Sequence, residues 1–325
     1  HTFRWGLLGT AHINRRLIPG MRAARRSTVA AVASRDPVRG ELYAREWNIP
    51  VAHTGYDALL HDQTVDAVYI PLPNSMHIEW TLRALDAGKH VLCEKPLALV
   101  PEDVDRVAAV ALARERVVAE AFMFRHEPLM ARVVELLADD AIGPVRSISA
   151  GFTYPQSRSN DVRLDRSLGG GSLWDVGCYA VNAARLVAGD EPTEVVGLSH
   201  MTASGVDDAF TGLLRFPRGV IAAAHSGFRA AYRTWLEVAG ADGVLRVANP
   251  FKPAPCDTIE IQRGDQTRRI EVTGSALLFV RQIDDFIATA LDGRPATVSL
   301  DDSRGNAAAL AALHRSAQSG RAVQL

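Results

Sequence analysis

The chain has 325 residues, of which 47% are hydrophobic and 22% charged, a composition typical of a globular protein with two domains. Its 36 basic and 37 acidic residues nearly balance, which argues against binding to nucleic acid or to anionic lipid. The apolar runs are too short to span a bilayer, and the three cysteines show no CxxC spacing. We therefore expect a cytoplasmic protein without disulfides. Because the chain begins at His1 and not at Met, an earlier loss of a leader segment stays open.

Strand and helix patterns alternate through the first third of the chain. Apolar runs predict strands at 3–8, 28–34, 65–70, 90–93 and 116–121, and helices are expected at 13–25, 37–47, 79–87 and 104–114. Asp36 is expected to cap the second helix, with Pro37 at its first position. This alternation predicts an α/β fold with a doubly wound parallel sheet.

After about Phe122 the pattern changes to consecutive strands joined by short turns. A helix at 127–138 is followed by strands at 145–154, 193–200, 209–216, 220–228, 235–239, 258–263 and 268–272, and then by helices at 276–291 and 303–316. This order predicts an α+β domain with a largely antiparallel sheet. We expect a first domain at 1–122 and a second at 123–325.

The turn after the first strand is the expected dinucleotide site. A complete G-x-G-x-x-G fingerprint allows a tight turn and a close approach of the pyrophosphate. Only Gly9 is kept here, with Ala11 and Asn14 in the other two places, so the motif alone is weak. Its position before a helix favours anion binding, and the predicted cofactor residues are Gly9, Thr10, Ala11, His12 and Ile13.

The end of the second predicted strand indicates which nicotinamide cofactor is bound. An NAD enzyme would place a carboxylate there to accept hydrogen bonds from the ribose hydroxyls, whereas this chain has Ser34-Arg35. A guanidinium can pair with a 2'-phosphate, so we expect NADP, with NAD as the less favoured cofactor. Arg35 could also be an ordinary loop arginine, and Asp36 could still reach the ribose.

A glycine-rich block later in the chain carries the candidate catalytic acid and phenol. Gly169-Gly-Gly-Ser172 precedes a predicted helix for which Ser172 is the expected N-cap. On that helix Asp175, Tyr179 and Asn182 share one face. Each of these residue types is more often structural when it occurs alone.

Several segments together resemble the Gfo/Idh/MocA family of nicotinamide-dependent oxidoreductases. They are Gly9-Thr-Ala-His-Ile, Pro71-Leu-Pro-Asn74-Ser-Met-His77, Ala87-Gly-Lys-His-Val-Leu-Cys-Glu94-Lys95-Pro96, Glu120-Ala-Phe-Met-Phe-Arg125-His-Glu-Pro128 and the Gly169–Asn182 block. The resemblance implies a Rossmann domain, a second domain with an open sheet used to form a homodimer or homotetramer, and a substrate cleft between them. The implied substrate is a small carbohydrate or polyol, as in the branch of glucose-fructose oxidoreductase, xylose dehydrogenases and dimeric dihydrodiol dehydrogenases.

The resemblance also implies roles for individual residues. Tyr179 stands where inositol dehydrogenases carry histidine, and it would move the substrate proton with Lys95 nearby, because an ammonium lowers a phenol pKa. Asp175 would orient the substrate or the lysine, and Pro96 predicts a rigid turn for which a cis bond is available. The cofactor contacts would come from Pro71, Leu72, Asn74, His77, Glu94 and Lys95.

Other assignments stay open at this point. His77 could equally have a structural role at a helix start, and Arg125 and Arg163 could bind substrate hydroxyls or pair with carboxylates. His126, His200 and His225 show no metal-ligand spacing, so we expect no metal. The alternative functions are a reductase of nucleotide-linked ketosugars, an NAD-dependent glycosidase, and a non-catalytic sugar or cofactor sensor of the same fold.

Overall fold

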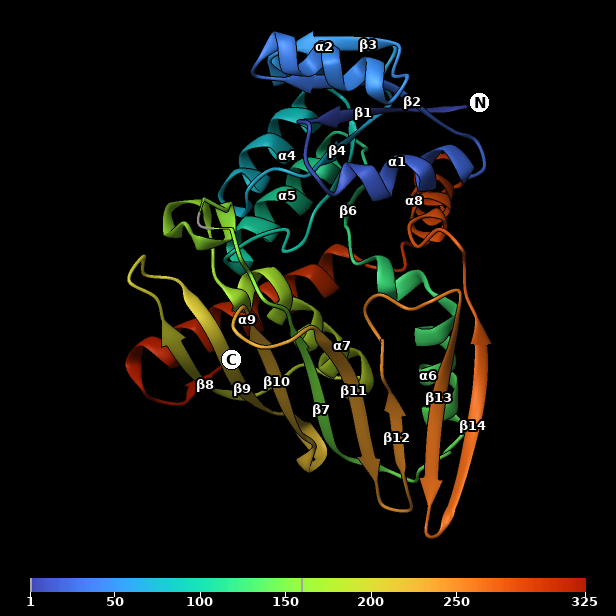
Figure 1. Cartoon of the computed structure of the whole chain (residues 1–325), viewed down its shortest axis with the longest axis vertical. Helices are drawn as coiled ribbons and strands as arrows, with labels where there is room; N and C mark the ends of the chain where they lie inside the picture. Colours follow the sequence, from blue (N-terminus) through green and yellow to red (C-terminus); the bar gives the residue numbers. More distant parts are fainter. Residues whose placement is uncertain (1, 159) are drawn as a thin grey trace. The chain divides into compact units, whose positions relative to one another are not determined.

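The computed structural model describes residues 2–158 and 160–325, which form two compact units (Figure 1). The first unit comprises His1–Ala98, Glu102–His126 and Leu277–Ser303. The second comprises Leu99–Pro101, Glu127–Ala276 and Arg304–Leu325. Among the described residues, no helix is both long enough and apolar enough to cross a bilayer.

The first unit is built on a parallel sheet of six strands in the order β3-β2-β1-β4-β5-β6. The strands are β1 (Phe3–Leu8), β2 (Ser27–Ser34), β3 (Val51–Thr54), β4 (Ala67–Ile70), β5 (His90–Cys93) and β6 (Val118–Glu120). The helices are α1 (Asn14–Ala23), α2 (Pro37–Glu46), α3 (Tyr56–Leu60), α4 (His77–Asp86) and α5 (Pro101–Ala113). The predicted doubly wound parallel sheet is confirmed, and its strand order reverses between β1 and β4, where such folds bind ligands.

Sequence analysis missed β3 and α3 because both are short, and β3 also lies at the edge of this sheet. β3 has four residues, and its first residue, Val51, is 37% exposed, so the strand lacks the apolar run that marks the buried strands. α3 has five residues, fewer than a periodic pattern needs to be recognised.

A helix from late in the chain completes the first unit. The ring of Phe286 in α8 (Val280–Asp292) lies 6.1 Å from that of Phe3 and 5.1 Å from that of Trp5, both in β1. The boundary expected after residue 122 leaves this helix in the second domain. Helical periodicity shows that α8 has an apolar face, but it does not show which surface that face covers.

The second unit contains a sheet of nine strands in the order β14-β13-β12-β11-β7-β10-β9-β8-β15. The strands are β7 (Val145–Thr153), β8 (Glu194–Met201), β9 (Asp207–Arg215), β10 (Ile221–Gly227), β11 (Arg233–Gly240), β12 (Val244–Val247), β13 (Cys256–Arg263), β14 (Gln266–Thr273) and β15 (Val323–Gln324). Only β7 and β10 pair in parallel, so the expected open and mainly antiparallel sheet is confirmed. The short strands β12 and β15 were not predicted.

The two faces of this sheet differ. Helices α6 (Pro128–Ala138), α7 (Cys178–Ala188) and α9 (Leu300–Ser319) pack against it, and in α9 the Ser316 hydroxyl accepts a hydrogen bond from the Gly197 N–H in β8. Alternate residues of β8, β9 and β10 point the other way, where Leu198 is 71%, Leu213 49% and Ile221 50% exposed. We call this second side the outer face.

Short helical segments connect these elements. They are 3-10 turns at Asn74–Met76, Met123–His126, Val162–Leu164, Arg166–Leu168 and Pro217–Gly219, and a π-helical turn at Leu173–Gly177. The π-helical turn joins α7 directly and carries one of the candidate catalytic residues, a location where such wide turns are frequent.

Candidate active site

The turn between β1 and α1 has the geometry of a phosphate-binding turn. Gly9 has a φ of +105°, which strains any residue with a side chain. Asn14, in place of the third glycine, is fully buried, and its amide donates a hydrogen bond to the Gly9 carbonyl across 2.9 Å. The predicted residues Gly9, Thr10, Ala11, His12 and Ile13 all lie in this turn, which ends at the first N–H groups of α1.

The end of β2 presents an arginine and keeps the neighbouring carboxylate occupied. Ser34 is 5% exposed, and Arg35 is exposed to solvent. The Asp36 carboxylate accepts hydrogen bonds from the backbone N–H groups of Val38 and Arg39, at 2.9 and 3.2 Å. Asp36 therefore caps α2 as predicted, and both capping bonds are accepted by its Oδ1.

Arg39 adds a second guanidinium that sequence analysis missed. Its Nη2 donates a hydrogen bond to the Thr10 carbonyl across 3.2 Å, so the side chain reaches from α2 back to the turn after β1. The sequence could have indicated Arg39, because it lies about one helical turn after Asp36, on the predicted helix that follows the second strand.

The loops after β4 and β5 carry the other predicted residues of the first unit. The two strands pair in parallel with Ile70 opposite Cys93, so the segments that follow them begin at the same edge of the sheet. The Tyr69 hydroxyl donates a hydrogen bond to the Glu94 carboxylate. The Lys95–Pro96 peptide bond is cis, the option that the sequence left open. The partly exposed residues here are Pro71, Leu72, Asn74, Glu94 and Lys95.

His77 lies at the same edge but is fully buried. Its Nδ1 is 2.8 Å from the Pro96 carbonyl oxygen and its Nε2 is 2.8 Å from that of Leu72. Burial is the main cause of a lowered pKa of His77, and the charge of Lys95 lowers this pKa further. The contacts with the two backbone carbonyl groups oppose the shift. Of the two roles left open for His77, its contacts match the structural one.

Arg125 pairs with a carboxylate of its own unit. Its Nη1 is 2.6 Å from Asp302 Oδ2, and the two side chains are 12% and 19% exposed. Of the two roles left open for Arg125, substrate binding and pairing with a carboxylate, the structure shows the second.

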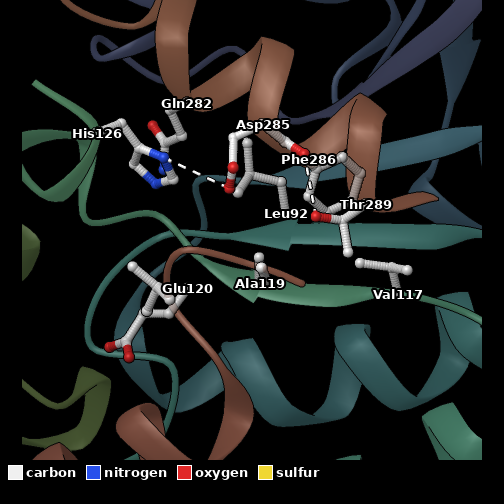
Figure 2. A pocket seen from close by; sticks show the side chains of 11 residues that line it. Leu92, Val117, Ala119, Glu120, His126, Gln282, Asp285, Phe286 and Thr289 are labelled. Atoms are coloured by element: carbon white, nitrogen blue, oxygen red, sulfur yellow. Dashed lines mark hydrogen bonds and ion pairs between the residues drawn. The ribbon is translucent and has the colours of Figure 1, made fainter. Parts of the chain in front are cut away.

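The neighbouring His126 lines a small cavity between β5, β6 and α8 (Figure 2). Its Nδ1 is 3.5 Å from Asp285 Oδ2, and burial lowers its pKa to about 4. The cavity has a volume of about 10 Å³, room for about one water molecule. It is too small to hold a sugar or a dinucleotide.

In the second unit, the glycine block brings a buried carboxylate to the start of the helix. Gly171 has a φ of +121°, and a Cβ there would lie 2.3 Å from Asp207 Oδ1. The Asp207 carboxylate accepts hydrogen bonds from the Ser172 hydroxyl at 2.6 Å and from the Leu173 N–H at 2.8 Å. Burial raises the pKa of Asp207.

Ser172 occupies the expected N-cap position and the helical turn begins at Leu173, but the Ser172 side chain makes no capping bond. Its hydroxyl donates to Asp207, and the same carboxylate accepts the Leu173 N–H. Asp207 comes from β9, so its position in the sequence gave no signal for this role.

Asp175 is held by two side chains from outside its helix. The Tyr154 hydroxyl donates a hydrogen bond to Asp175 Oδ2 across 2.7 Å, and Arg163 Nε lies 3.0 Å from the same oxygen. Arg163 Nη1 also lies 3.1 Å from Asp161 Oδ1. The Asp175 carboxylate is the main cause of a raised pKa of Arg163. Arg163 therefore pairs with carboxylates, one of its two predicted options.

Tyr179 is 4% exposed and packs among aromatic rings. Its ring centroid lies 5.7 Å from that of Phe152 and 5.5 Å from that of Phe251. Phe152 and Tyr154 are two residues apart, which places their side chains on one side of the strand. Because Phe152 contacts Tyr179 and Tyr154 contacts Asp175, both of these candidate catalytic residues face the end of β7. Asn182 is fully buried on α7.

The outer face carries a shallow hollow of about 740 Å³. Its lining includes Leu198, His200, His225 and Trp235, and none of the candidate catalytic residues. Across residues 2–158 and 160–325, no group of three or more His, Cys, Asp or Glu side chains is arranged to hold a metal ion. Cys93, Cys178 and Cys256 are free thiols.

Two family models match the chain and together cover both units. One, described as an oxidoreductase family with an NAD-binding Rossmann fold, matches residues 3–122, and the other, described as the GFO/IDH/MocA C-terminal domain, matches residues 130–246. The chain belongs to the Gfo/Idh/MocA family of oxidoreductases. These matches confirm the family resemblance that the sequence motifs indicated.

Curated relatives and solved structures agree with this family over almost the whole chain. A D-xylose 1-dehydrogenase (NADP(+)) of Haloferax volcanii is 35% identical over 324 residues, 99% of each chain. The crystal structure of a 3-ketoreductase from Actinomadura kijaniata with NADP and TDP-benzene has a TM-score of 0.92 and 34% identity, covering 97% of this chain and 98% of that one. An aldose-aldose oxidoreductase from Caulobacter crescentus, complexed with glycerol, has a TM-score of 0.92 and 29% identity over 100% of both chains.

Proposed function

We propose that this Gfo/Idh/MocA oxidoreductase transfers a hydride between NADP and a sugar-like substrate, at a secondary alcohol or ketone or at a lactol carbon. The observation that carries the proposal is the pair Asp175 and Tyr179, an anchored carboxylate and a phenol that both face β7 in a member of this family. Two relatives support the substrate class, because their names give D-xylose and an aldose as what they act on.

The choice of NADP is supported by the residues around the turn after β1. Gly9 allows a pyrophosphate to approach the backbone, and Arg35 at the end of β2 suits a 2'-phosphate. The neighbouring carboxylate of Asp36 is engaged in capping α2. Pro71, Leu72, Asn74 and Glu94 would complete the cofactor contacts at the ends of β4 and β5.

Tyr179 would act as the general acid and base. When bound, the nicotinamide supplies or accepts the hydride, and the protein must move one proton on the substrate oxygen. In oxidation Tyr179 removes the hydroxyl proton, and in reduction it returns a proton to the carbonyl oxygen. Its aromatic surroundings of Phe152 and Phe251 fix the ring, so the hydroxyl is held in one place.

Lys95 would stabilise the negative charge that develops on the reacting oxygen. Its ammonium would hydrogen-bond that oxygen and compensate the charge by Coulomb attraction. Its backbone is fixed at the carboxyl end of β5, where Tyr69 binds the adjacent Glu94. A lysine whose backbone is fixed in this way keeps one geometry better than a lysine on a free loop.

Asp175 would orient the substrate and would not carry the proton. Tyr154 and Arg163 both contact its Oδ2, and the Arg163 guanidinium compensates its charge. A carboxylate held by these two contacts is fixed in orientation, which suits it to bind substrate hydroxyls. This assignment leaves the proton to Tyr179.

A reductase of nucleotide-linked ketosugars is the second candidate. The observation that favours it is the likeness to the Actinomadura kijaniata 3-ketoreductase, whose structure holds TDP-benzene. This function would use the same hydride and proton steps. It would differ in requiring a nucleoside diphosphate on the substrate.

We also propose that the chain forms a homodimer or homotetramer through the outer face. Leu198, Leu213 and Ile221 expose apolar surface there on three adjacent strands. Contiguous apolar surface of this kind marks interaction sites. A second copy that covered it would also protect β8 and its neighbours from non-specific pairing.

The experiment is a panel of substrates with both cofactors. Reduction of NADP+ and of NAD+ is followed with aldoses, inositols, anhydro-sugars and dihydrodiols, and oxidation of NADPH is followed with a dTDP-linked ketosugar. We expect NADP+ reduction with one sugar or polyol class. Activity on the nucleotide-linked substrate alone would select the second candidate. Bound NADPH, detected by its fluorescence, without turnover of any substrate would contradict both.

A further inference from the structure

His77 joins two loops that begin at the same edge of the first sheet. Its imidazole lies between the carbonyl of Leu72, in the loop after β4, and the carbonyl of Pro96, in the turn after β5. Each ring nitrogen is 2.8 Å from its carbonyl oxygen. A neutral imidazole carries one N–H and an imidazolium carries two, so at least one contact is a donated hydrogen bond in either form.

The two contacts differ in how far they are shielded from water. The contact with the Pro96 carbonyl is buried, whereas the contact with the Leu72 carbonyl is partly exposed. Solvent can replace a donor at a partly exposed carbonyl, but a buried carbonyl without a donor is costly. The proton on Nδ1 is therefore the one on which the Pro96 carbonyl depends.

The backbone on both sides of Lys95 is fixed by other bonds. Before it, the Glu94 N–H donates to the Ile70 carbonyl of β4 across 3.0 Å. After it, the Leu97 N–H donates to Glu120 Oε1 across 2.8 Å in a buried bond, and Glu120 is 2% exposed. His77 holds the Pro96 carbonyl between these points, so it sets the orientation of the Pro96–Leu97 peptide and thereby restrains the backbone next to Lys95.

We propose that His77 is a positioning residue for Lys95 and acts through the Pro96 carbonyl. The inference rests on the proposed function, in which Lys95 acts on the reacting oxygen. The imidazole has both nitrogens turned to backbone carbonyls inside the protein, so it touches neither substrate nor cofactor. Its contribution is the placement of the lysine, and small errors in placement reduce turnover strongly.

Two substitutions of His77 test its contacts with the Pro96 and Leu72 carbonyls one at a time. The amide nitrogen of asparagine lies close to the place of histidine Nδ1, and that of glutamine lies close to the place of Nε2. His77→Asn therefore keeps a donor for Pro96, whereas His77→Gln keeps one for Leu72. We expect His77→Gln to lower kcat about 10- to 100-fold and His77→Asn to restore most of that loss, with the Kd of NADPH changed less than about threefold in both.

The melting temperature of each variant is measured alongside. A merely structural role predicts that kcat and stability fall together in both variants. Equal losses of kcat in His77→Asn and His77→Gln, or losses that follow the melting temperatures, would overturn the positioning role.

A double-mutant cycle with Lys95→Met tests the link to the lysine. Turnover is measured with the best substrate of the panel described above. If His77 acts through Lys95, adding His77→Gln to Lys95→Met causes no further loss. A further loss of the same factor as in the wild-type background would overturn the inference while leaving the role of Lys95 intact. Wild-type turnover in Lys95→Met alone would instead overturn the proposed role of Lys95, and the inference with it.

Discussion

The Tyr154 hydroxyl donates a hydrogen bond to the Asp175 carboxylate across 2.7 Å, and the same oxygen is contacted by Arg163. Tyr154 follows β7 directly, so a residue at the end of a strand fixes a residue of the π-helical turn. This arrangement makes Asp175 an oriented and charge-compensated group.

Removal of the Tyr154 hydroxyl tests that arrangement. Tyr154→Phe should lower kcat/KM about 3- to 10-fold, because one hydrogen bond to Asp175 is lost while the aromatic packing stays. Steady-state kinetics with the best substrate of the panel measures the effect. A kcat/KM equal to that of the wild type would contradict the role of Tyr154.

The arginine after β2 should decide the preference between the two cofactors. Arg35→Ala should weaken NADPH binding about 10- to 100-fold, because a charge-assisted contact to the 2'-phosphate is lost, and should leave NADH binding nearly unchanged. Fluorescence titration gives both Kd values. Arg45→Ala is the matched control, since this arginine is 78% exposed on α2. Equal losses for NADPH and NADH would rule out the 2'-phosphate as its partner.

His126 should make the protein less stable in acid. Burial lowers the pKa of His126 to about 4, below its value in the unfolded chain, so the unfolded state takes up the proton first. The stabilisation is present above about pH 6.5 and is lost as the pH falls towards 4, a difference of roughly 3 kcal/mol. Urea unfolding across this range should show a smaller decrease in the free energy of unfolding for His126→Gln. Parallel curves for the two proteins would contradict the assignment.

The outer face should govern the oligomeric state. Leu213→Glu places a charge in the middle of the exposed apolar surface, and we expect it to dissociate the oligomer into monomers. Light scattering coupled to gel filtration measures the mass. Leu112→Glu is the matched control, because Leu112 is 82% exposed on α5 of the first unit. An unchanged mass for Leu213→Glu would place the interface elsewhere, and a monomeric wild type would remove the proposal.

The fold was largely predictable because each domain repeats a simple pattern. Buried parallel strands such as β1 and β4 are nearly continuous apolar runs, and turns with glycine or proline separate the antiparallel strands. The missed strands β3, β12 and β15 are short, so local pattern carries little information about them. The return of α8 to the first unit depends on contacts with Phe3 and Trp5, which are far away in the sequence.

Sequence patterns predicted the parts of the candidate site that lie within one helix, but not the contacts between a helix and residues from elsewhere in the chain. Helical spacing placed Asp175 and Tyr179 together, and a capping pattern identified Asp36 correctly. The partners Tyr154 and Asp207 come from the sheet, and no spacing connects them to the helix. Ser172 lies at the expected N-cap position, but the sequence does not reveal that its hydroxyl donates to the buried Asp207.

The central claim is that Tyr179 carries the proton, and Tyr179→Phe tests it most directly. The measurement is kcat for NADP+ reduction with the best substrate of the panel, together with the Kd of NADPH. We expect kcat to fall about 100- to 10,000-fold while the Kd stays within about threefold, because only the proton-transferring hydroxyl is lost. A kcat within about tenfold of wild type would show that another group moves the proton.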